Sequence, residues 1–224
     1  MEKRFYQSQW GTDEIIDKLI YSNQDNKDKK GIFVEIGAYD GVKYSNTYYF
    51  EKIKDWTGIL VEPLPNQYAL CSYNRWGITH HGCVSSYNGY CKFGWIKGYS
   101  EMVSGIIENF QPKFRDRVFK EINQHKQEIQ LLEIPTVTIN SLLSSYNIMK
   151  VDYLSLDTVS TELEVLQAFD IEKNPTKIIS LDTNGMNLER YLEWFTENNY
   201  EKYWKSSVSD EYIFVHKTFK YSWE

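Results

Sequence analysis

The alternation of apolar and amphipathic segments is the feature that most restricts the fold of this chain. Short apolar runs occur in "GIFVEIG", "TGILVEP", "ITHHGCV", "VDYLSLD" and "TKIISLD", and stretches with helical spacing separate most of them. Such alternation is typical of a parallel sheet with helices on its faces. The sequence therefore predicts an α/β fold with a doubly wound, mostly parallel sheet.

Three other segments extend this prediction. The runs "YEKYWKS" and "EYIFVHK", joined by "SVSD", predict a C-terminal antiparallel hairpin that completes a seven-stranded sheet. An N-terminal helix is expected over about 12–23, with Thr12 as its cap. Over about 90–140 the alternation breaks, and "YCKFGWI" and "EIPTVTI" predict an inserted strand and helix region. Because a chain of 224 residues has the size of one domain, we expect 1–224 to form a single domain.

Composition argues against several classes of protein. No apolar run approaches the roughly 20 residues that cross a bilayer, so we expect no membrane insertion. The start "MEKRFYQSQWG" lacks the apolar stretch of a signal peptide, which predicts a cytoplasmic protein, in the host cytoplasm if the gene is viral. Cys71, Cys83 and Cys91 form no CxxC pair, which argues against a disulfide framework and a zinc site. The acids are also too scattered to suggest a metal.

The charge of the chain argues against a nucleic-acid partner. Its net charge is −6, whereas binding to phosphate backbones depends on basic surfaces. One basic stretch, "KFRDRVFKEINQHK", is better interpreted as an amphipathic helix. Its apolar positions are Phe114, Val118, Ile122 and Ile129, and the basic positions on the solvated side are Lys113, Arg115, Arg117 and Lys120.

The predicted sheet places several polar and small residues in one crevice. Ligands of doubly wound sheets bind outside the carboxyl ends of the strands, where the strand order reverses. The strand ends that meet there are Glu35 to Gly37, Glu62, Cys83 to Val84 and Asp157, with Asp182 next in line.

The turn after the first strand, "FVEIGAYDGVKYSNT", favours S-adenosylmethionine over a dinucleotide. Gly37 and Gly41 do not fit the GxGxxG spacing that admits a pyrophosphate. A carboxylate at Glu35 would repel a pyrophosphate and favour a ligand with an ammonium group. Glu62, at the end of the next strand, suits a ribose diol at a spacing close to that of Rossmann-like units. The plainer interpretation is a tight glycine turn and an ordinary strand-end acid at Glu62.

Several longer phrases resemble one family. "SQWGTDEII", "GIFVEIGAYDGVKYSNTYYFEK", "WTGILVEPLPNQY", "GYSEMVSGI", "VDYLSLDT", "ELEVLQAFD" and "DEYIFV" are similar to the FkbM family of S-adenosylmethionine-dependent methyltransferases, from Ser8 to about Val215. The resemblance implies a class I Rossmann-like fold and methyl transfer to an oxygen, most often a sugar hydroxyl.

The resemblance also implies roles for individual residues. Glu35, Gly37, Asp40 and Gly41 match the first cofactor motif, Ser45 and Asn46 match the start of the following helix, and Glu62 matches the ribose-binding acid. The element "SQxGxD" is present as Ser8, Gln9, Gly11 and Asp13, and we expect it near the cofactor.

Two segments depart from the family pattern on the acceptor side. Where relatives read "DTEGxE", this chain reads "DTVSTE", so that Val159 and Ser160 replace a glutamate and a glycine. Where relatives have a Glu-His-Asn-like run, it reads "LDTNG". A glycine at a turn gives access to positive φ, and the lost carboxylate removes a polar or acid/base group. These changes bear on the acceptor and on turnover more than on the cofactor.

Asp157 is the first candidate for a catalytic base and Asp182 the second. A sugar hydroxyl is a weak nucleophile, and a positioned carboxylate that takes its proton assists the transfer. The alternative for each acid is a helix N-cap, because Asp157 precedes "TVSTELEVL" and Asp182 precedes "TNGMNLERYL".

The sequence thus predicts an S-adenosylmethionine-dependent O-methyltransferase that acts on a carbohydrate or a glycosylated small molecule. The alternative is a weakened or inactive module that binds the cofactor or a glycosyltransferase partner. The sequence also leaves open whether the protein forms a homo-oligomer.

Overall fold

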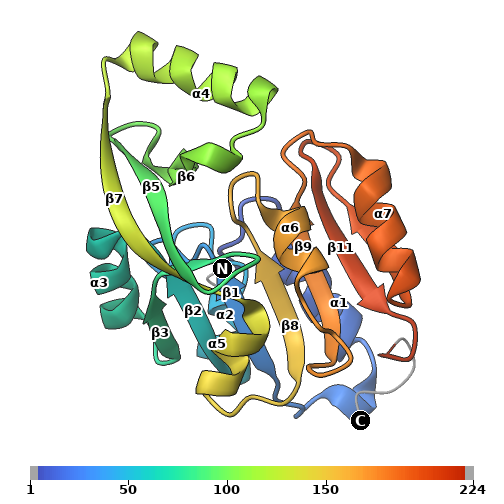
Figure 1. The fold of residues 1–224 in the computed structure, drawn as a ribbon. Coiled ribbons are helices and arrows are strands. Elements are labelled where there is room, and N and C mark those ends of the chain that lie inside the picture. The colour runs from blue at the N-terminus through green and yellow to red at the C-terminus, as the bar shows by residue number, and fades with distance from the viewer. Residues whose placement is uncertain (1–4, 220–224) are drawn as a thin grey trace.

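The computed structural model describes residues 5–219, which form a large mixed sheet with helices on both faces and a smaller sheet standing above it (Figure 1). The main sheet has the order β10 (Tyr200–Lys205), β11 (Glu211–His216), β9 (Thr176–Asp182), β8 (Val151–Leu156), β1 (Ile32–Ile36), β2 (Thr57–Glu62) and β3 (Ile78–His81). Neighbouring strands are parallel except where β11 pairs antiparallel with both β9 and β10. The predicted seven strands and C-terminal hairpin are therefore present.

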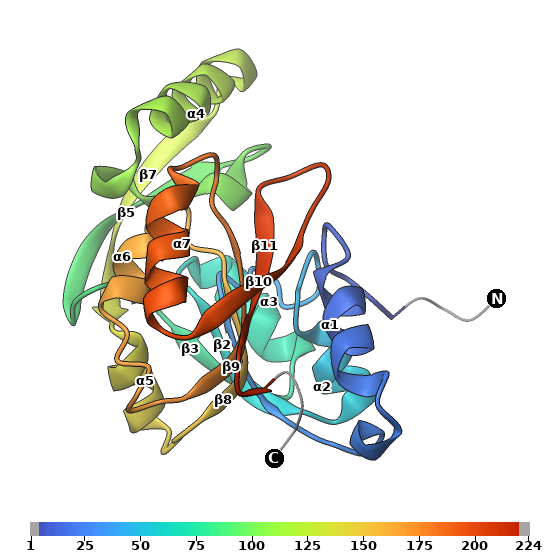
Figure 2. The ribbon, with the colours of Figure 1, turned by 90° about the vertical axis from the view of Figure 1, so that its right-hand side faces the viewer.

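Helices cover both faces of this sheet, as Figure 2 shows from the side. One face packs against α1 (Thr12–Tyr21), α2 (Tyr48–Lys54) and α3 (Pro65–Asn74), and the other against α5 (Ile139–Ser145), α6 (Glu162–Gln167) and α7 (Leu188–Glu197). The alternation along a strand explains the two cores. Phe33 packs with the α1 and α2 side, whereas its neighbour Val34 packs with the α5 to α7 side, because successive strand residues point to opposite faces.

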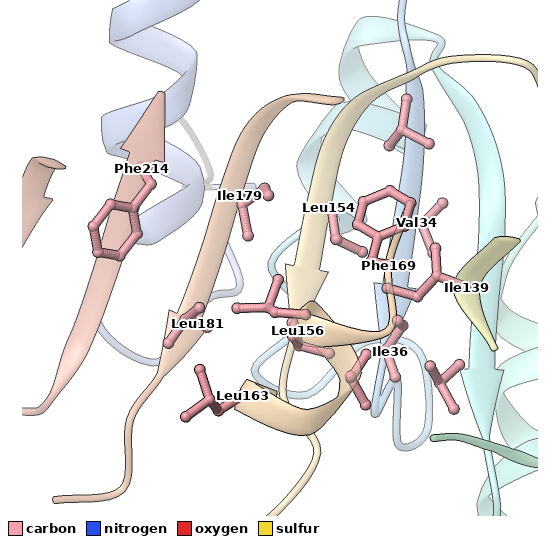
Figure 3. Close-up of a cluster of buried hydrophobic side chains, with 14 of the residues drawn as sticks. Val34, Ile36, Ile139, Leu154, Leu156, Leu163, Phe169, Ile179, Leu181 and Phe214 are labelled. Atoms are coloured by element: carbon pink, nitrogen blue, oxygen red, sulfur yellow. The ribbon is translucent and has the colours of Figure 1, made fainter. Parts of the chain in front are cut away.

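Side chains from distant parts of the chain form the larger core (Figure 3). It includes Val34, Ile36, Leu154, Leu156, Ile179, Leu181 and Phe214 from the strands, with Ile139, Leu163 and Phe169 from the covering segments. The strand residues in this set are almost fully buried. Burial of such apolar surface is the main favourable term in folding, at roughly 25 cal/mol per Å².

The inserted region builds a second sheet. This sheet has the order β4 (Cys83–Val84), β7 (Glu128–Val137), β5 (Gly89–Lys97) and β6 (Gly105–Ile106), and α4 (Pro112–His125) packs on it. Short 3₁₀ turns lie at η1 (Gln24–Asn26), η2 (Glu101–Val103) and η3 (Ile107–Asn109). We refer to the segment from β5 to β7, with α4, as the arm (Figure 1).

Three local predictions were wrong. The run "ITHHGCV" is not one strand, because it breaks at Gly82 and continues in the second sheet as β4. Thr12 does not cap the first helix, because Gly11 occupies the cap position and the Thr12 hydroxyl donates to Glu211 instead. Ile129 is on β7 and not on the helix that contains Phe114, which ends at His125.

A buried ion pair network fixes the loop between β1 and α2. The Arg75 side chain is fully buried and donates from Nε to Glu51 (2.9 Å) and from Nη1 to Glu35 (3.2 Å). The same guanidinium donates to the Gly41 carbonyl at 2.9 Å and to the Thr47 hydroxyl at 2.8 Å. One cation thus compensates two buried carboxylates and satisfies the loop, as buried charges require.

We expect Arg75→Met to lower the free energy of unfolding by about 3–5 kcal/mol, because it leaves Glu35 buried without a counter-charge and leaves Glu51 with Lys52 as its only cation among the described residues. Urea denaturation followed by circular dichroism measures this. Arg117→Met is the matched control, since the exposed pair of Arg117 with Glu121 should contribute less than about 1 kcal/mol. Equal losses in the two variants would contradict the role given to Arg75.

Within residues 5–219, no helix combines the length and the apolar character needed to cross a bilayer.

Candidate active site

A cavity opens at the carboxyl ends of the main-sheet strands and beneath the arm. It contains about 710 Å³ of space free of atoms, part of which is open to solvent. Apolar side chains form one part of its wall, namely Val61, Leu64, Val84, Phe93 and Ile106. Three carboxylates, those of Glu62, Glu101 and Asp157, also line it, and no lysine or arginine does among the described residues. The cavity therefore favours a cationic ligand with an apolar portion.

The sequence prediction and the cavity agree in part. Gly37, Glu62, Cys83, Val84 and Asp157 line the cavity, as their strand-end positions predicted. Glu35, Asp40, Gly41, Ser45 and Asn46 lie in or beside the loop after β1 but do not line the cavity, and neither does Asp182.

Glu35 differs most from the expected arrangement. Its carboxylate accepts hydrogen bonds from the Ser45 and Thr47 hydroxyls and from the Asn46 backbone N–H, in addition to Arg75. These contacts, all within 3.2 Å, occupy both oxygens. Glu35 therefore organises the loop rather than presenting a free charge to an ammonium group.

Gly37 and Asp40 shape the same loop by different means. Gly37 has a φ of 84°, and a Cβ at this position would lie 2.1 Å from the backbone oxygen of Asp157. Only glycine allows this approach of β1 to the end of β8. Asp40 accepts from the backbone N–H groups of Val42 and Lys43 at 2.9 and 2.7 Å, which closes an Asx-type turn.

Glu62 lies at the end of β2 and is only 5% exposed. Its oxygens accept from the backbone N–H groups of Leu64 and Tyr39, each at 2.8 Å. Burial raises the pKa of Glu62 to about 7, although these two hydrogen bonds act in the opposite direction. The carboxyl group is thus held in fixed orientation at the cavity wall, and its charge depends on pH near neutrality.

Glu101 connects the arm to the main-sheet side of the cavity. Its carboxylate accepts from the Trp95 indole (2.9 Å), the Tyr39 hydroxyl (2.8 Å) and the Gln67 amide (2.6 Å). Burial acts to raise the pKa of Glu101, but these hydrogen bonds lower it overall. The sequence analysis did not single out Glu101, although the phrase "GYSEMVSGI" contains it, because its partners lie in three separate segments.

Asp157 faces the cavity from the end of β8. Its side chain is exposed to the cavity, and its carboxylate makes no hydrogen bond within the described part of the chain. Desolvation by the surrounding protein is the main cause that raises the pKa of Asp157 to about 7, and repulsion from Asp182 and Glu35 adds to it. The N-cap alternative is wrong for this residue, because Thr161 occupies the cap position of α6.

Asp182 lies at the end of β9, outside the cavity wall. Its Oδ1 accepts from the backbone N–H of Asn184 at 2.7 Å, and burial raises its pKa. It does not cap α7 either, since Asn187 accepts from Glu189 in that position. The structure thus separates the two candidate acids into one at the cavity and one in the adjacent turn.

The N-terminal element "SQxGxD" contacts both the loop after β1 and the start of β11. Asp13 accepts from the Ser8 hydroxyl, and Ser8 forms a β-bridge with Tyr44 in the loop after β1. The neighbouring Thr12 hydroxyl donates to Glu211 at the start of β11. The element therefore joins the first loop to the antiparallel strand.

Within residues 5–219, no group of three or more His, Cys, Asp or Glu side chains is arranged to hold a metal ion.

Comparison with known proteins identifies the family. The sequence model described as "Methyltransferase FkbM domain" matches residues 35–202, which is most of the chain. The chain belongs to the FkbM methyltransferase family. The matched range includes the loop after β1, the three cavity carboxylates and both candidate acids.

One solved structure, titled "delta-N METTL16 MTase domain", is similar at a TM-score of 0.39 and 11% sequence identity. The similarity covers 90% of this chain and 78% of that chain. No curated protein matches. The seven-stranded, mostly parallel sheet with a C-terminal antiparallel hairpin agrees with the predicted fold, and β11 of this hairpin lies between β9 and β10.

Glu211→Gln should make the protein more stable at pH 8 and leave its stability unchanged at pH 5. Burial raises the pKa of Glu211 to about 8, so the folded protein retains a proton that the unfolded chain releases above its ordinary pKa. Stability therefore falls as pH rises from about 4.5 to 8, on the order of 2–4 kcal/mol, and glutamine removes this dependence.

Thermal unfolding between pH 5 and pH 8 measures the effect. Glu193→Gln, on the exposed face of α7, is the control and should follow the wild type throughout. An equal loss of stability from pH 5 to pH 8 in the wild type and in Glu211→Gln would contradict the assignment, because Glu62 and Asp157 contribute to the loss in both proteins.

Proposed function

We propose that the protein is an S-adenosylmethionine-dependent O-methyltransferase that methylates a hydroxyl of a sugar, in a glycan or a glycosylated metabolite. The observation that carries the proposal is the charge of the cavity. Three carboxylates line it without a lysine or arginine, at the strand ends where a methyltransferase of this family needs its methyl donor.

The residues of the cavity fit this cofactor. S-adenosylmethionine supplies a methyl group on a positively charged sulfur, and it also carries an ammonium group, an adenine ring and a ribose diol. Val61, Leu64 and Val84 offer an apolar surface for the ring, and Glu62 offers a carboxylate for the diol. A pyrophosphate ligand would instead face repulsion from the three acids.

Asp157 is the residue placed to act as a base. A general base works best when its pKa lies near the operating pH, and the pKa of Asp157 is raised to about 7. Because its carboxylate has no hydrogen-bond partner among the described residues, it is available to orient an acceptor hydroxyl and to take its proton. Asp182 is less suited, since one of its oxygens closes the turn at Asn184.

The choice of a sugar hydroxyl rests on the resemblance to the family and on the presence of this base. An oxygen nucleophile of this kind is weak at neutral pH, and much of the rate must come from holding it against the methyl group. The arm and the loop after β8 supply the walls that would do this.

Calorimetric titration with S-adenosylmethionine tests the proposal. We expect binding that tightens from pH 6 to pH 8 and releases protons, because a cationic ligand lowers the raised pKa values of Glu62 and Asp157. Titrations in two buffers with different ionisation enthalpies count the protons. Glu62→Gln should weaken binding about tenfold or more, since a neutral amide replaces the charge.

Asp157→Asn should reduce the proton release, and Glu172→Gln, at an exposed position, should behave as the wild type. NAD⁺ is the ligand control and should give no heat. Absence of heat with S-adenosylmethionine at high concentration, in a folded protein, would refute the proposal.

A second candidate is a weakened or inactive module, which the departures at Val159 and Ser160 motivate. Ser160 keeps a positive φ of 71°, the conformation that the glycine of relatives adopts easily. Val159 packs against the apolar cluster of the arm, and a Cβ on Gly105 would lie 3.3 Å from it. The valine is therefore part of the packing between arm and loop, which favours an adapted site.

Restoring the family residues separates the two candidates. Ser160→Gly should stabilise the protein by up to about 1 kcal/mol, because it relieves the left-handed backbone. Val159→Glu should cost about 1–3 kcal/mol, because it places a carboxylate at a partly buried position against the apolar cluster of the arm. Urea denaturation gives both values. Methyl transfer to a panel of oligosaccharides should not increase in the double variant, and a large increase would indicate a decayed site.

A further inference from the structure

A second cavity lies between the arm and the α6–α7 side of the main sheet. Its wall includes Gln111 and Phe114 from the start of α4, Ser160 and Gln167 around α6, and Asn187 and Arg190 around α7. It contains about 1250 Å³ of space free of atoms, part of which is open to solvent. None of the residues that line the first cavity lines this one, so the two are distinct.

Two buried hydroxyl groups in this wall have no hydrogen-bond partner. Ser160 is 4% exposed and Tyr191 is fully buried, and both side-chain oxygens are unsatisfied among the described residues. Nearly all buried polar groups in proteins are paired, so an unpaired one needs an explanation. Both oxygens lie just beneath the wall, so a ligand with hydroxyl groups pairs with them once the side chains that cover them shift.

The remaining wall combines the apolar side chains of Pro112, Leu163 and Met186 with several amides, and it is balanced in charge. Gln111, Gln167, Asn184 and Asn187 contribute amide groups, which both donate and accept hydrogen bonds. Arg190 and Glu164 contribute one charge of each sign. A phosphate or a carboxylate would need an excess of cations, and an apolar molecule would leave the amides unpaired. The chemistry that fits is a neutral molecule with many hydroxyl groups.

The position of this cavity relates it to methyl transfer. Ser160 follows Asp157 in the loop before α6, and the flanking Val159 and Thr161 line the first cavity. Asn184 follows Asp182 in the turn after β9. The wall of the second cavity is thus built from the same two loops that carry the candidate acids.

We infer that the second cavity binds the part of the acceptor that is not methylated, as a neutral, hydroxyl-rich unit such as a further sugar residue. This inference rests on the proposed function, because it places the reacting hydroxyl at Asp157. It assigns acceptor selection to Ser160, Gln167 and the amides around them.

Saturation-transfer NMR tests the inference with methyl glycosides of common hexoses and deoxyhexoses as probes. The measurement uses the full chain with S-adenosylhomocysteine present. We expect signals from at least one glycoside with the wild type. Gln167→Trp should abolish them, because an indole at this exposed end of α6 fills the cavity. Glu193→Trp, on the part of α7 that lines neither cavity, should leave them unchanged.

Calorimetry with S-adenosylmethionine accompanies each variant, so that the two proposals fail in different ways. Unchanged cofactor binding with loss of the glycoside signals in Gln167→Trp supports the inference. Glycoside signals that persist in Gln167→Trp, or that are absent from the wild type, overturn it while cofactor binding still supports the proposed function. Absence of S-adenosylmethionine binding to the wild type refutes the proposed function instead.

Discussion

The interaction on which the site depends is the buried network of Arg75 with Glu35 and Glu51. It holds the loop after β1 in one conformation by using a single guanidinium to satisfy two carboxylates, a carbonyl and hydroxyl groups. Gly37 and Tyr39 take their positions from this loop, and Tyr39 donates to both Glu62 and Glu101. Two of the three acids that face the cavity, Glu62 and Glu101, are therefore oriented through a loop that Glu35, which does not face it, helps to hold.

The arm completes the cavity through polar contacts of Glu101 and through apolar contacts with Val159. Glu101 ties it to the first loop and to α3, whereas Val159 joins the loop after β8 to the cluster around Phe110 and Phe114. The carboxyl groups give the cavity a negative charge. Near neutral pH, Glu62 and Asp157 are partly protonated, since their pKa values are raised to about 7. Such a site has its full attraction for a cation only after protons leave.

Much of the fold could be predicted from the sequence, because strand and helix periodicity are local properties. The strand ends at Gly37, Glu62 and Asp157 were placed correctly for the same reason, since parallel strands bring their carboxyl ends to one edge. The break at Gly82 was missed, because "ITHHGCV" has one continuous apolar pattern and only the pairing partners of β3 and β4 differ. The role of Glu35 was also different from the prediction, since nothing near it in the sequence indicates Arg75.

The sequence by itself determined the order of the elements, the hairpin at the C-terminus and the set of acids at the strand ends. Only the tertiary structure decided which of these acids are neutralised and which face a cavity. The physical reason is that the charge and hydrogen bonding of a buried carboxylate depend on partners far along the chain, as Arg75 is from Glu35 and Thr12 from Glu211. The local sequence pattern predicts where a side chain lies on its strand. The groups that contact this side chain depend on how strands, helices and the arm pack together.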